Sequence, residues 1–378
     1  MKSIGIVGLP NVGKSTLFNV ITELSVPAEN FPFTTIDKNI GIIDYKDPRL
    51  TALVQTVSAA QVYPATIQFV DIAGLIRGAS KGEGLGNQFL SHIREVDLIM
   101  FILRGFMDQK VTHVYNRYDP RQDMEDVVTE LILKDLESVD KKLSLIEAQT
   151  KKGKNEKTQA EIDTLIKLKE SLNEGNTAYK FVHEHVKGKE ALERLVYDLF
   201  LLTNKPALAV LNISYIDMSD EKYRAQVETW TNDVREYAER VYGKGEAEEI
   251  AYIDSKFLAD IKSFSAEEIE ELRSELAYFC DVQTLVDMAK KKLNLINFFV
   301  GSEVDARSWF IEKGADILKA ASLIHTSLAE RFVRAQILNV QDLIDLGSYN
   351  EVKAVGKIKT VGKDYIVQDG DYTIILAS

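Results

Sequence analysis

Cysteine is almost absent from this chain, which has 378 residues and a single thiol at Cys280. One thiol cannot form an internal disulfide framework, so the small disulfide-rich folds of secreted proteins are excluded. Long apolar runs are absent as well, because no stretch approaches the roughly 18 residues of a membrane helix. The apolar residues 4–7 near the start are too few for a signal peptide. We therefore expect a cytoplasmic, globular protein without a membrane partner.

Positive charge is scarce, with 46 Lys and Arg residues against 58 Asp and Glu residues and a net charge of −12. Non-specific binding to nucleic acids draws its free energy largely from neutralised phosphates, so we expect no DNA partner. RNA would have to meet a local basic patch, for which residues 151–157 and 290–292 are candidates, although most charge runs are solvated faces. The length allows two or three domains, and we take a monomer as the working expectation.

Near its start the chain contains a phosphate-binding loop, since residues 8–15 read Gly-Leu-Pro-Asn-Val-Gly-Lys-Ser and match the pattern G-x-x-x-x-G-K-S. A strand-like stretch precedes the loop and a helical pattern follows it, as this motif requires. We expect backbone N–H groups to face the phosphates, with Lys14 reaching the β- and γ-phosphates and Ser15 binding Mg²⁺. The nucleotide-binding residues predicted on the loop are Asn11, Val12, Gly13, Lys14, Ser15 and Thr16.

A second motif, Asp-Ile-Ala-Gly-Leu at residues 71–75, ends the strand-like run 66–70. We expect Asp71 to hold Mg²⁺ beside the phosphate-binding loop, and the N–H of Gly74 to contact the γ-phosphate. Residues 31–35, Phe-Pro-Phe-Thr-Thr, lie between the two motifs and have no helical periodicity. One of their two hydroxyl groups can complete the magnesium shell, and the residues alone favour neither threonine.

Glycines are concentrated directly after the second motif, at positions 78, 82, 84 and 86. Glycine gives the backbone high conformational freedom, which suits a loop that orders around a γ-phosphate and relaxes after hydrolysis. We interpret residues 76–87 as a switch rather than as an ordinary surface loop. The catalytic residues that these motifs predict are Lys14 and Gly74.

From about residue 124 the apolar spacing changes to that of a long amphipathic helix. The stripe resumes after a polar break at residues 151–157, so the pattern predicts two antiparallel helices joined by a short turn that carries the first basic cluster. The residues of the two stripes are Ile132, Leu136, Val139, Leu143 and Ile146, followed by Ile162, Leu165, Leu168 and Leu172. A hairpin that projects from an enzyme is more often a docking element than a catalytic one, although structural packing is the alternative.

A buried strand returns at residues 206–211 and ends at Asn212, where guanine-specific proteins carry the sequence N-K-x-D. Ile213 stands in the lysine position and Tyr215 in the aspartate position. A carboxylate there accepts both donors of guanine, so its absence removes the main advantage of guanine over adenine. The amide of Asn212 can still bond to a purine edge. The base-contacting residues predicted here are Asn212 and Ile213.

The C-terminal part shows strand-like runs at 296–300 and 308–311 and a helical stretch at 317–332. Residues 365–368 and 372–375 alternate and flank Asp-Gly-Asp, which is a strong signal for a β-hairpin. The order of elements predicts a β-grasp sheet around one helix. It holds no cluster of nucleophile, base or metal ligands, so we expect an interaction module.

Four stretches of the sequence together resemble the YchF family, also called Obg-like ATPases, within the translation-factor class of P-loop proteins. They are GLPNVGKST at residues 8–16, FPFTT at 31–35, DIAGLIRGASKGEGLGNQFL at 71–90 and KDYIVQDGD at 363–371. The resemblance implies an α/β P-loop nucleotide-binding domain at 1–123 and 203–282, interrupted by a helical coiled coil at 124–202. It also implies a small ubiquitin-like TGS domain at 283–378 that contacts RNA or ribosomal components.

The resemblance implies further site residues. It makes Thr35 the switch threonine that binds Mg²⁺ and places Ser255 in the last base-contacting loop. It implies that ATP is preferred over GTP, but the family usually carries Glu where this chain has Tyr215, which leaves the strictness of that preference open. Asn11 matches the asparagine of potassium-activated relatives, where K⁺ adds positive charge between the phosphates.

Hydrolysis needs a water molecule held in line with the γ-phosphate, which a Gln positions in Ras-like proteins. The corresponding residue is Leu75, which cannot form a hydrogen bond, so we expect slow intrinsic turnover. By resemblance His113, in the polar loop 108–119, matches a histidine proposed to position that water. An exposed loop histidine is more usually only solvated.

These observations predict an ATP-hydrolysing switch protein that associates with the ribosome, with Mg²⁺ as cofactor and K⁺ as a second candidate. Two alternatives stay open: a GTPase of the same architecture, and an interaction or chaperone-like protein for which hydrolysis is incidental. A small-molecule kinase is disfavoured, because the sequence shows no lid with paired arginines and no signature of an acceptor pocket.

Overall fold

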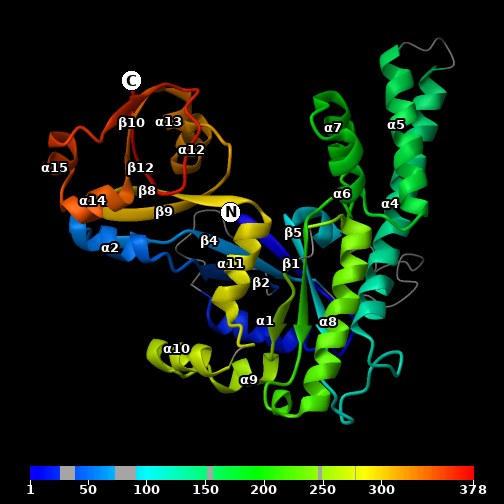
Figure 1. The fold of residues 1–378 in the computed structure, drawn as a ribbon. Coiled ribbons are helices and arrows are strands. Elements are labelled where there is room, and N and C mark those ends of the chain that lie inside the picture. Colours follow the sequence, from blue (N-terminus) through cyan, green and yellow to red (C-terminus); the bar gives the residue numbers. More distant parts are fainter. Residues whose placement is uncertain (26–38, 73–90, 151–155, 246–248, 277) are drawn as a thin grey trace.

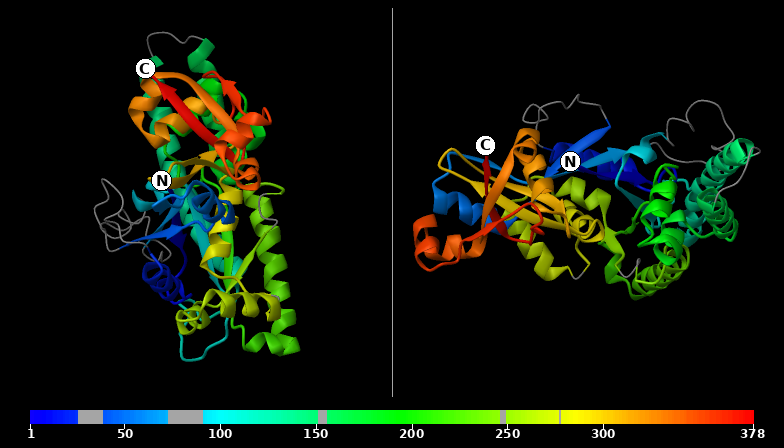
Figure 2. Two further views of the ribbon diagram at one scale, coloured as in Figure 1. Left: turned by 90° about the vertical axis from the view of Figure 1, so that its left-hand side faces the viewer. Right: turned by 90° about the horizontal axis from the view of Figure 1, so that it is seen from above.

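The computed structural model describes residues 1–25, 39–72, 91–150, 156–245, 249–276 and 278–378. It has three parts: a central sheet with its helices, a long helical hairpin and a C-terminal sheet (Figure 1). Seen from above, the hairpin and the C-terminal sheet lie at opposite ends of the molecule (Figure 2). Within the described ranges, no helix combines the length and the apolar character needed to cross a membrane.

The central sheet has six strands in the order β2-β4-β1-β5-β6-β7, and every neighbouring pair is parallel except β2 with β4. The strands are β1 (Lys2–Val7), β2 (Ile40–Asp44), β4 (Thr66–Asp71), β5 (Leu98–Arg104), β6 (Ala207–Asn212) and β7 (Ala251–Ile253). The helices are α1 (Lys14–Glu23), α8 (Glu221–Tyr242), α9 (Ser255–Asp260), α10 (Ala266–Glu275), α11 (Val282–Lys292) and the 3-10 turn η4 (Asp217–Ser219). The predicted α/β fold is confirmed, and the segments after β1, β5 and β6 meet at the carboxyl edge of the sheet.

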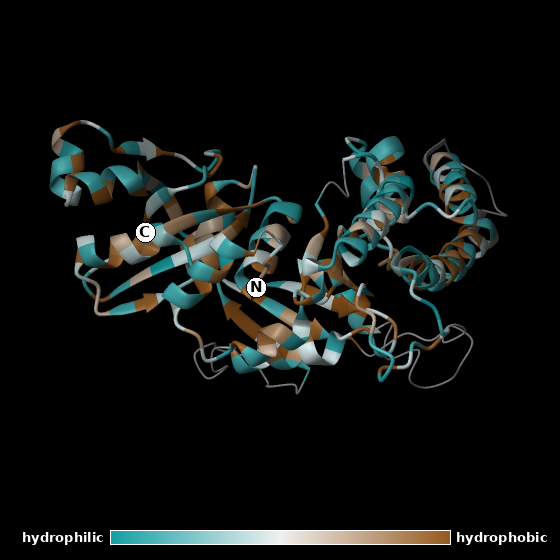
Figure 3. Cartoon of the chain, turned by 60° about the horizontal axis from the view of Figure 1, so that its bottom comes forward, coloured by the Kyte–Doolittle hydropathy of each residue, from teal (hydrophilic) through white to brown (hydrophobic). Residues whose placement is uncertain are grey.

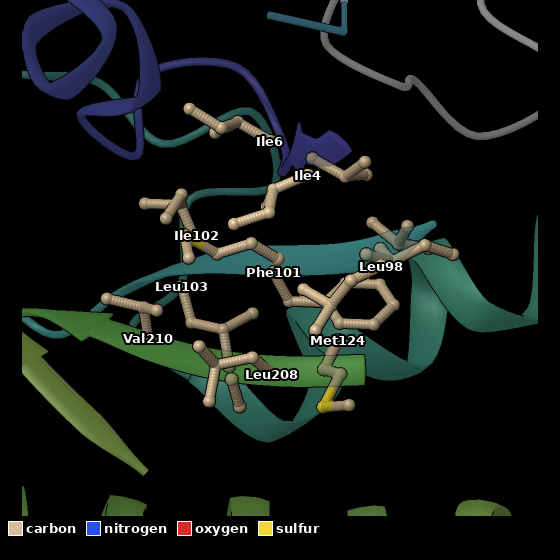
Figure 4. Packing of buried hydrophobic residues seen from close by; sticks show 14 of the residues in the cluster. Ile4, Ile6, Leu98, Phe101, Ile102, Leu103, Met124, Leu208 and Val210 are labelled. Carbon is tan, nitrogen blue, oxygen red and sulfur yellow. The ribbon is translucent and has the colours of Figure 1, made fainter. Parts of the chain in front are cut away.

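The strand β5 forms the centre of the core, since all seven of its residues are buried. Figure 4 shows Ile4 and Ile6 of β1 on one side of β5 and Leu208 and Val210 of β6 on the other. A parallel strand that is covered on both faces reads as a continuous apolar run, which is why the sequence of β5 shows no alternation. The charged exception is Arg104, its last residue.

The inserted segment forms the predicted antiparallel hairpin, with α4 (Pro120–Thr150) and α5 (Glu156–Asn173) side by side (Figures 1 and 2). The two apolar stripes contact each other, since Val139, Leu165 and Leu168 have no exposed surface. Hydrophilic residues alternate with these stripes around both helices (Figure 3). Outside the described residues lie Lys151, Lys152, Lys154 and the side chain of Lys157, the basic cluster predicted at the tip.

The chain leaves the hairpin through α6 (Ala178–Phe181), the π-helical turn η3 (Val182–Val186) and α7 (Glu190–Tyr197). Where it returns to the central sheet, the buried carboxylate of Asp135 in α4 accepts hydrogen bonds from the N–H groups of Leu202 and Thr203 at 2.7 and 2.8 Å. Thr203 Oγ1 donates a third bond at 2.6 Å. Burial raises the pKa of Asp135 to about 6, although these bonds act in the opposite direction. Asp135 therefore ties the exit of the insertion to its entry helix.

The C-terminal part is a second six-stranded sheet in the order β11-β10-β12-β8-β9-β3. Its strands are β3 (Gln61–Tyr63), β8 (Leu295–Gly301), β9 (Asp305–Glu312), β10 (Phe332–Asn339), β11 (Lys359–Val361) and β12 (Asp371–Ala377). Its helices are α2 (Pro48–Val57), α12 (Ile317–Ile324), α13 (Thr326–Glu330), α14 (Val340–Leu346) and α15 (Tyr349–Ala354). β8 and β9 form an antiparallel hairpin, α12 follows, and β12 returns parallel to β8, which is the predicted β-grasp order.

The hairpin predicted around Asp-Gly-Asp is wrong. Residues 365–368 contribute one isolated bridge, from Ile366 to Asp316, while β12 pairs with β10 and β8. The pairing of β12 with the distant strands β10 and β8 is preferred over a local hairpin at Asp-Gly-Asp, because it buries the side chains of Tyr372 and Thr373 between neighbouring strands.

The helix predicted at 317–332 is also shorter than expected. His325 interrupts it with an extended backbone and caps α13 with its side chain, which accepts a hydrogen bond from the N–H of Ser327. Phe332 already belongs to β10, whose eight residues pair with β12 and β11.

The division between the central and C-terminal parts differs from the predicted one, which places residues 1–123 and 203–282 in the nucleotide-binding domain and residues 283–378 in the C-terminal domain. Although β3 and α2 lie within the first 123 residues, β3 pairs with β9, and Leu50 and Leu53 of α2 pack in one core with Phe299. Arg49 of α2 also forms an ion pair with Asp369 at 2.7 Å. Conversely, α11 crosses residue 283 and buries its apolar face in the core of the central part.

The second basic cluster, residues 290–292, lies in the last turn of α11 and is engaged within the protein. The ammonium group of Lys290 lies 4.6 Å from the centroid of the Tyr45 ring, and Lys291 forms an ion pair with Glu249. These contacts support the interpretation of this cluster as a structural surface.

Candidate nucleotide-binding site

A cavity of about 920 Å³ lies at the carboxyl edge of the central sheet. It is enclosed by the loop after β1, the segment after β5, the turn after β6 and the start of α9. The lining residues are Leu9, Pro10, Asn11, Gly13, Lys14, Ser15 and Thr16; Phe106, Met107, Asp108, Gln109 and Val111; Asn212, Ile213, Ser214, Ile216 and Asp217; and Asp254, Ser255, Lys256, Phe257 and Asp260. The structure thus brings the predicted phosphate loop together with Asn212, Ile213 and Ser255.

Two glycines allow the phosphate loop its shape. Gly13 has a φ angle of 95°, and a Cβ atom there would lie 2.0 Å from Asn212 Nδ2. At Gly8 a Cβ atom would lie 2.6 Å from the carbonyl oxygen of Ile102. The N-cap Gly13 offers no side-chain hydrogen bond to α1, so the first N–H groups of this helix are available to an anion in the cavity.

Lys14 and Asp71 form an ion pair at the phosphate end of the cavity. Lys14 begins α1 and is 8 % exposed, while Asp71 ends β4, the strand next to β1. The exposed Ser15 follows Lys14 and lines the cavity. A hydroxyl and a carboxylate are the hard oxygen ligands that Mg²⁺ prefers, with its other ligands coming from phosphate and water. The donor set of Ser15 and Asp71 therefore fits a magnesium ion.

Within the described ranges, no group of three His, Cys, Asp or Glu side chains is arranged to hold a metal ion. An ion that takes most of its ligands from phosphates and water needs no such cage. Outside the described residues lie Thr35, to which the resemblance gives a role in magnesium binding, Gly74, predicted to contact the γ-phosphate, Leu75, and the glycine-rich segment 76–87 that we interpret as a switch.

Asn212 connects three of the four segments that enclose the cavity. Its Nδ2 atom donates a hydrogen bond to the carbonyl of Val12 at 2.8 Å. Its Oδ1 atom accepts hydrogen bonds from the N–H of Ser255 at 3.0 Å and from Ser255 Oγ at 3.1 Å. The side chain is 4 % exposed. The amide therefore holds the phosphate loop, the end of β6 and the start of α9 in one arrangement. It lies at the start of the turn after β6, residues 213–217, which we call the base-side turn.

Tyr215 fills the position of the guanine-reading aspartate with a buried ring. Its hydroxyl accepts a hydrogen bond from the N–H of Cys280 at 3.0 Å, and its own N–H donates to Asp254 Oδ2 at 2.9 Å. Burial raises the pKa of this phenol far above its ordinary value. Tyr215 lies outside the cavity lining, so the turn after β6 presents no carboxylate from this position. Burial also raises the pKa of the Cys280 thiol to about 12, which disfavours the thiolate, the reactive form of cysteine.

Several lining residues had no signal in the sequence. Asp217 is exposed and lines the cavity two positions beyond Tyr215, beside Ile216, which is 78 % exposed. Phe106 and Met107 also line the cavity, from the segment that follows β5. Asp217 is displaced from the position of the known motif, and Phe106 and Met107 are apolar residues after a strand, so none of them matches a sequence pattern. Inspecting every residue that follows the end of a predicted strand would have found them.

The structure corrects the expected setting of His113, which is 4 % exposed and not solvated. Its Nδ1 atom accepts a hydrogen bond from the N–H of Tyr115, and its Nε2 atom lies 2.9 Å from Asp123 Oδ2 of α4. Buried carboxylates on the first turns of α4 provide the partner that the loop composition did not reveal. His113 lies outside the cavity lining, whereas Asn11 lies in it and donates a hydrogen bond to the carbonyl of Thr112 at 3.0 Å.

The fold and the cavity define the class of the protein: a phosphate loop, an Asp-ended neighbouring strand and a base-side turn on a parallel sheet are the site of a P-loop nucleoside triphosphatase. Comparison with known proteins agrees. A family model described as 50S ribosome-binding GTPase matches residues 3–147. A second model, YchF-GTPase_C, described as a protein of unknown function, matches residues 295–377.

Full-length relatives define the family. The ribosome-binding ATPase YchF of Bacillus subtilis is 38 % identical over 97 % of this chain and 96 % of its own length. Obg-like ATPase 1 of Caenorhabditis elegans is 37 % identical over 97 % of this chain and 90 % of its own. The structure of the Schizosaccharomyces pombe YchF GTPase superimposes with a TM-score of 0.82 at 33 % identity, covering 99 % of this chain and 97 % of that one. This chain belongs to the YchF family of Obg-like ATPases.

Proposed function

We propose that this protein binds ATP in preference to GTP, hydrolyses it slowly and associates with the ribosome in a nucleotide-dependent manner. The observation that carries the proposal is the base-side turn of the cavity, where the buried ring of Tyr215 replaces the carboxylate that guanine requires. Without that acceptor, the two donors of guanine lose their partner. The apolar side chains of Phe106, Ile213 and Ile216 provide walls for a purine of either kind.

The phosphate end supports magnesium-dependent chemistry. Lys14, paired with Asp71 in this structure, exchanges that partner for the phosphates when a nucleotide binds. Ser15, Asp71 and Thr35 are the proposed ligands of Mg²⁺, which would neutralise charge that develops on the phosphates. The N–H of Gly74 is proposed to contact the γ-phosphate, and K⁺ near Asn11 remains a candidate second cation.

Slow hydrolysis follows from Leu75, which offers no hydrogen bond to a water molecule. The catalytic role of His113 stays a prediction, because its ring is paired with Asp123 and lies outside the cavity lining. It requires a rearrangement of residues 105–119 that brings the ring to the γ-phosphate.

The base preference is tested by calorimetry of the full chain with ATP and with GTP in the presence of Mg²⁺. We expect ATP to bind more tightly by at least about tenfold, or about 1.4 kcal/mol. The matched variant is Asp217→Asn, because this exposed carboxylate lines the cavity two positions after Tyr215, which stands where the aspartate is missing. GTP binding that equals ATP binding in the wild type and falls in Asp217→Asn would show that Asp217 reads guanine, and the preference for ATP would be wrong.

Association with the ribosome is supported by the relatives that are named ribosome-binding ATPases, and by the hairpin and C-terminal sheet that extend from either end of the nucleotide-binding part (Figure 2). We expect purified ribosomes to raise the ATP turnover of this protein several-fold, while a mock preparation without ribosomes leaves it unchanged. Turnover that is identical with and without ribosomes would instead favour a binding module in which hydrolysis is incidental.

A further inference from the structure

Arg104 is a buried cation at the end of β5. It is 1 % exposed, and its Nη1 atom has no hydrogen-bond partner in the part of the chain that the structure describes. The acceptors of its other nitrogens are backbone carbonyls: Nε donates to Phe106 at 3.3 Å and Nη2 to Asp108 at 3.0 Å. Removing a charge from water without an opposite charge beside it is costly. Stability alone therefore does not explain why this residue is an arginine.

The guanidinium group also contacts two aromatic rings. Its carbon atom lies 4.5 Å from the ring centroid of Phe106 and 5.1 Å from that of Tyr118. Phe106 and Tyr118 stand near the two ends of the segment 105–119, which connects β5 to α4. A planar cation that stacks on rings at both ends and donates to two carbonyls fixes the course of this segment.

The part of the segment that Arg104 holds is a wall of the nucleotide cavity. Phe106, Met107 and Asp108 line the cavity, beside the turn after β6. The N–H of Gly105 donates to the carbonyl of Asn212 at 2.8 Å. The wall made by Phe106 therefore adjoins the base-side turn, and its position depends on the two carbonyls that Arg104 binds.

The rest of the segment has its own anchors. Arg117 forms ion pairs with Asp123 at 2.9 Å and with Asp126 at 2.6 Å, and His113 also contacts Asp123. Asn11 of the phosphate loop donates a hydrogen bond to the carbonyl of Thr112 in this segment. Because these contacts do not involve Arg104, its loss should release residues 106–108 while leaving the remainder of the segment in place.

We propose that Arg104 is a positioning residue for the nucleotide, which sets the Phe106–Asp108 wall against the base-side turn without touching the nucleotide itself. This inference rests on the proposed function, because it requires that the cavity takes a nucleoside triphosphate. It assigns to Arg104 a contribution to the binding of the nucleoside and none to the binding of the phosphates.

The test compares two ligands that share phosphates and differ in the nucleoside: the magnesium complexes of ATP and of inorganic tripolyphosphate, each titrated by calorimetry into the full chain. In Arg104→Met we expect ATP to bind about tenfold more weakly, and tripolyphosphate to bind with unchanged affinity. In steady-state turnover, KM for ATP should rise while kcat stays the same. Arg104→Lys keeps the charge but not the planar fork, so it should rescue only part of the ATP affinity.

Thermal unfolding separates positioning from a structural role. Methionine replaces a buried charge with an apolar chain of similar length, so the unfolding midpoint of Arg104→Met should equal or exceed that of the wild type. The control is Arg121→Met, which removes an arginine that lies 5.5 Å from the Tyr237 ring and pairs with Glu125 on α4, away from the cavity. It should bind both ligands as the wild type does.

Three results would overturn the inference. ATP affinity that is unchanged in Arg104→Met, or an equal loss for ATP and tripolyphosphate, removes the positioning role. A lowered midpoint with a loss of both ligands assigns Arg104 to folding instead. The wild-type titration decides the proposed function separately, since a chain that binds tripolyphosphate but gains nothing from the nucleoside of ATP would contradict it as well.

Discussion

The variant Lys14→Met is expected to lose ATP turnover by at least about 100-fold, because it removes the cation of the phosphate loop that we propose neutralises the phosphates. In the structure this ammonium group is nearly buried and is paired with Asp71. Methionine preserves the length of the side chain but provides no charge. Turnover should be measured with saturating Mg²⁺ and ATP, and ATP affinity by calorimetry.

Two controls keep this result interpretable. Lys262→Met removes an exposed lysine that pairs with Glu23 on the surface, outside the cavity lining, and should leave turnover unchanged. The unfolding midpoint of Lys14→Met should stay close to that of the wild type, since Asp71 is partly exposed and water can solvate it. A folded Lys14→Met that retains turnover within about threefold of the wild type would contradict the assignment of the phosphate loop.

The variant Asp135→Ala is expected to lower the free energy of unfolding by about 3 kcal/mol, the largest stability effect that we predict. It leaves the buried N–H groups of Leu202 and Thr203 without their acceptor at the point where the insertion rejoins the central sheet. Chemical denaturation followed by far-UV circular dichroism measures this loss. Asp140→Ala is the matched control on the same helix, because Asp140 is half exposed and pairs with the half-exposed Lys169.

The same variant has an expected pH dependence. Burial raises the pKa of Asp135 in the folded protein to about 6, above the value of an unfolded chain. Stability contributed by such a group is complete below the unfolded pKa and falls as the pH rises through the folded pKa. The stability deficit of Asp135→Ala should therefore be larger near about pH 5 than near about pH 7.5. A deficit that does not change over this range, or one no larger than that of Asp140→Ala, would count against the role of Asp135.

The elements that the sequence predicts well are those with local signals. The phosphate loop lies in eight consecutive residues, and its strand and helix adjoin it. The seam of the hairpin repeats over several turns, so Val139 and Leu165 could be assigned to an interface before their partners were known.

The elements that could not be predicted depend on distant partners. β3 has three residues, none of them buried, and its role appears only when Gln61 pairs with Asp305. β12 pairs with β10 and β8, so the turn at Asp-Gly-Asp could not indicate its neighbours. Beside the site, the burial of His113 depends on Asp123, which lies just before the helix that the sequence pattern predicts. Arg104 follows an apolar run and matches no motif.

The pairing of β3 with β9 also bears on how the chain is made. During synthesis, residues 48–63 are made long before the C-terminal strands that contact them. Leu50 and Leu53 therefore lack their core neighbour Phe299, and Val62 lacks its pairing partner Ala306, for most of the time that the chain is being made. A fragment that stops after α11 keeps these residues but not Phe299 or β9. Residues 48–63 therefore complete their packing only after the strands of the C-terminal sheet have been synthesised, whereas β1, α1 and β4 pack in the central core.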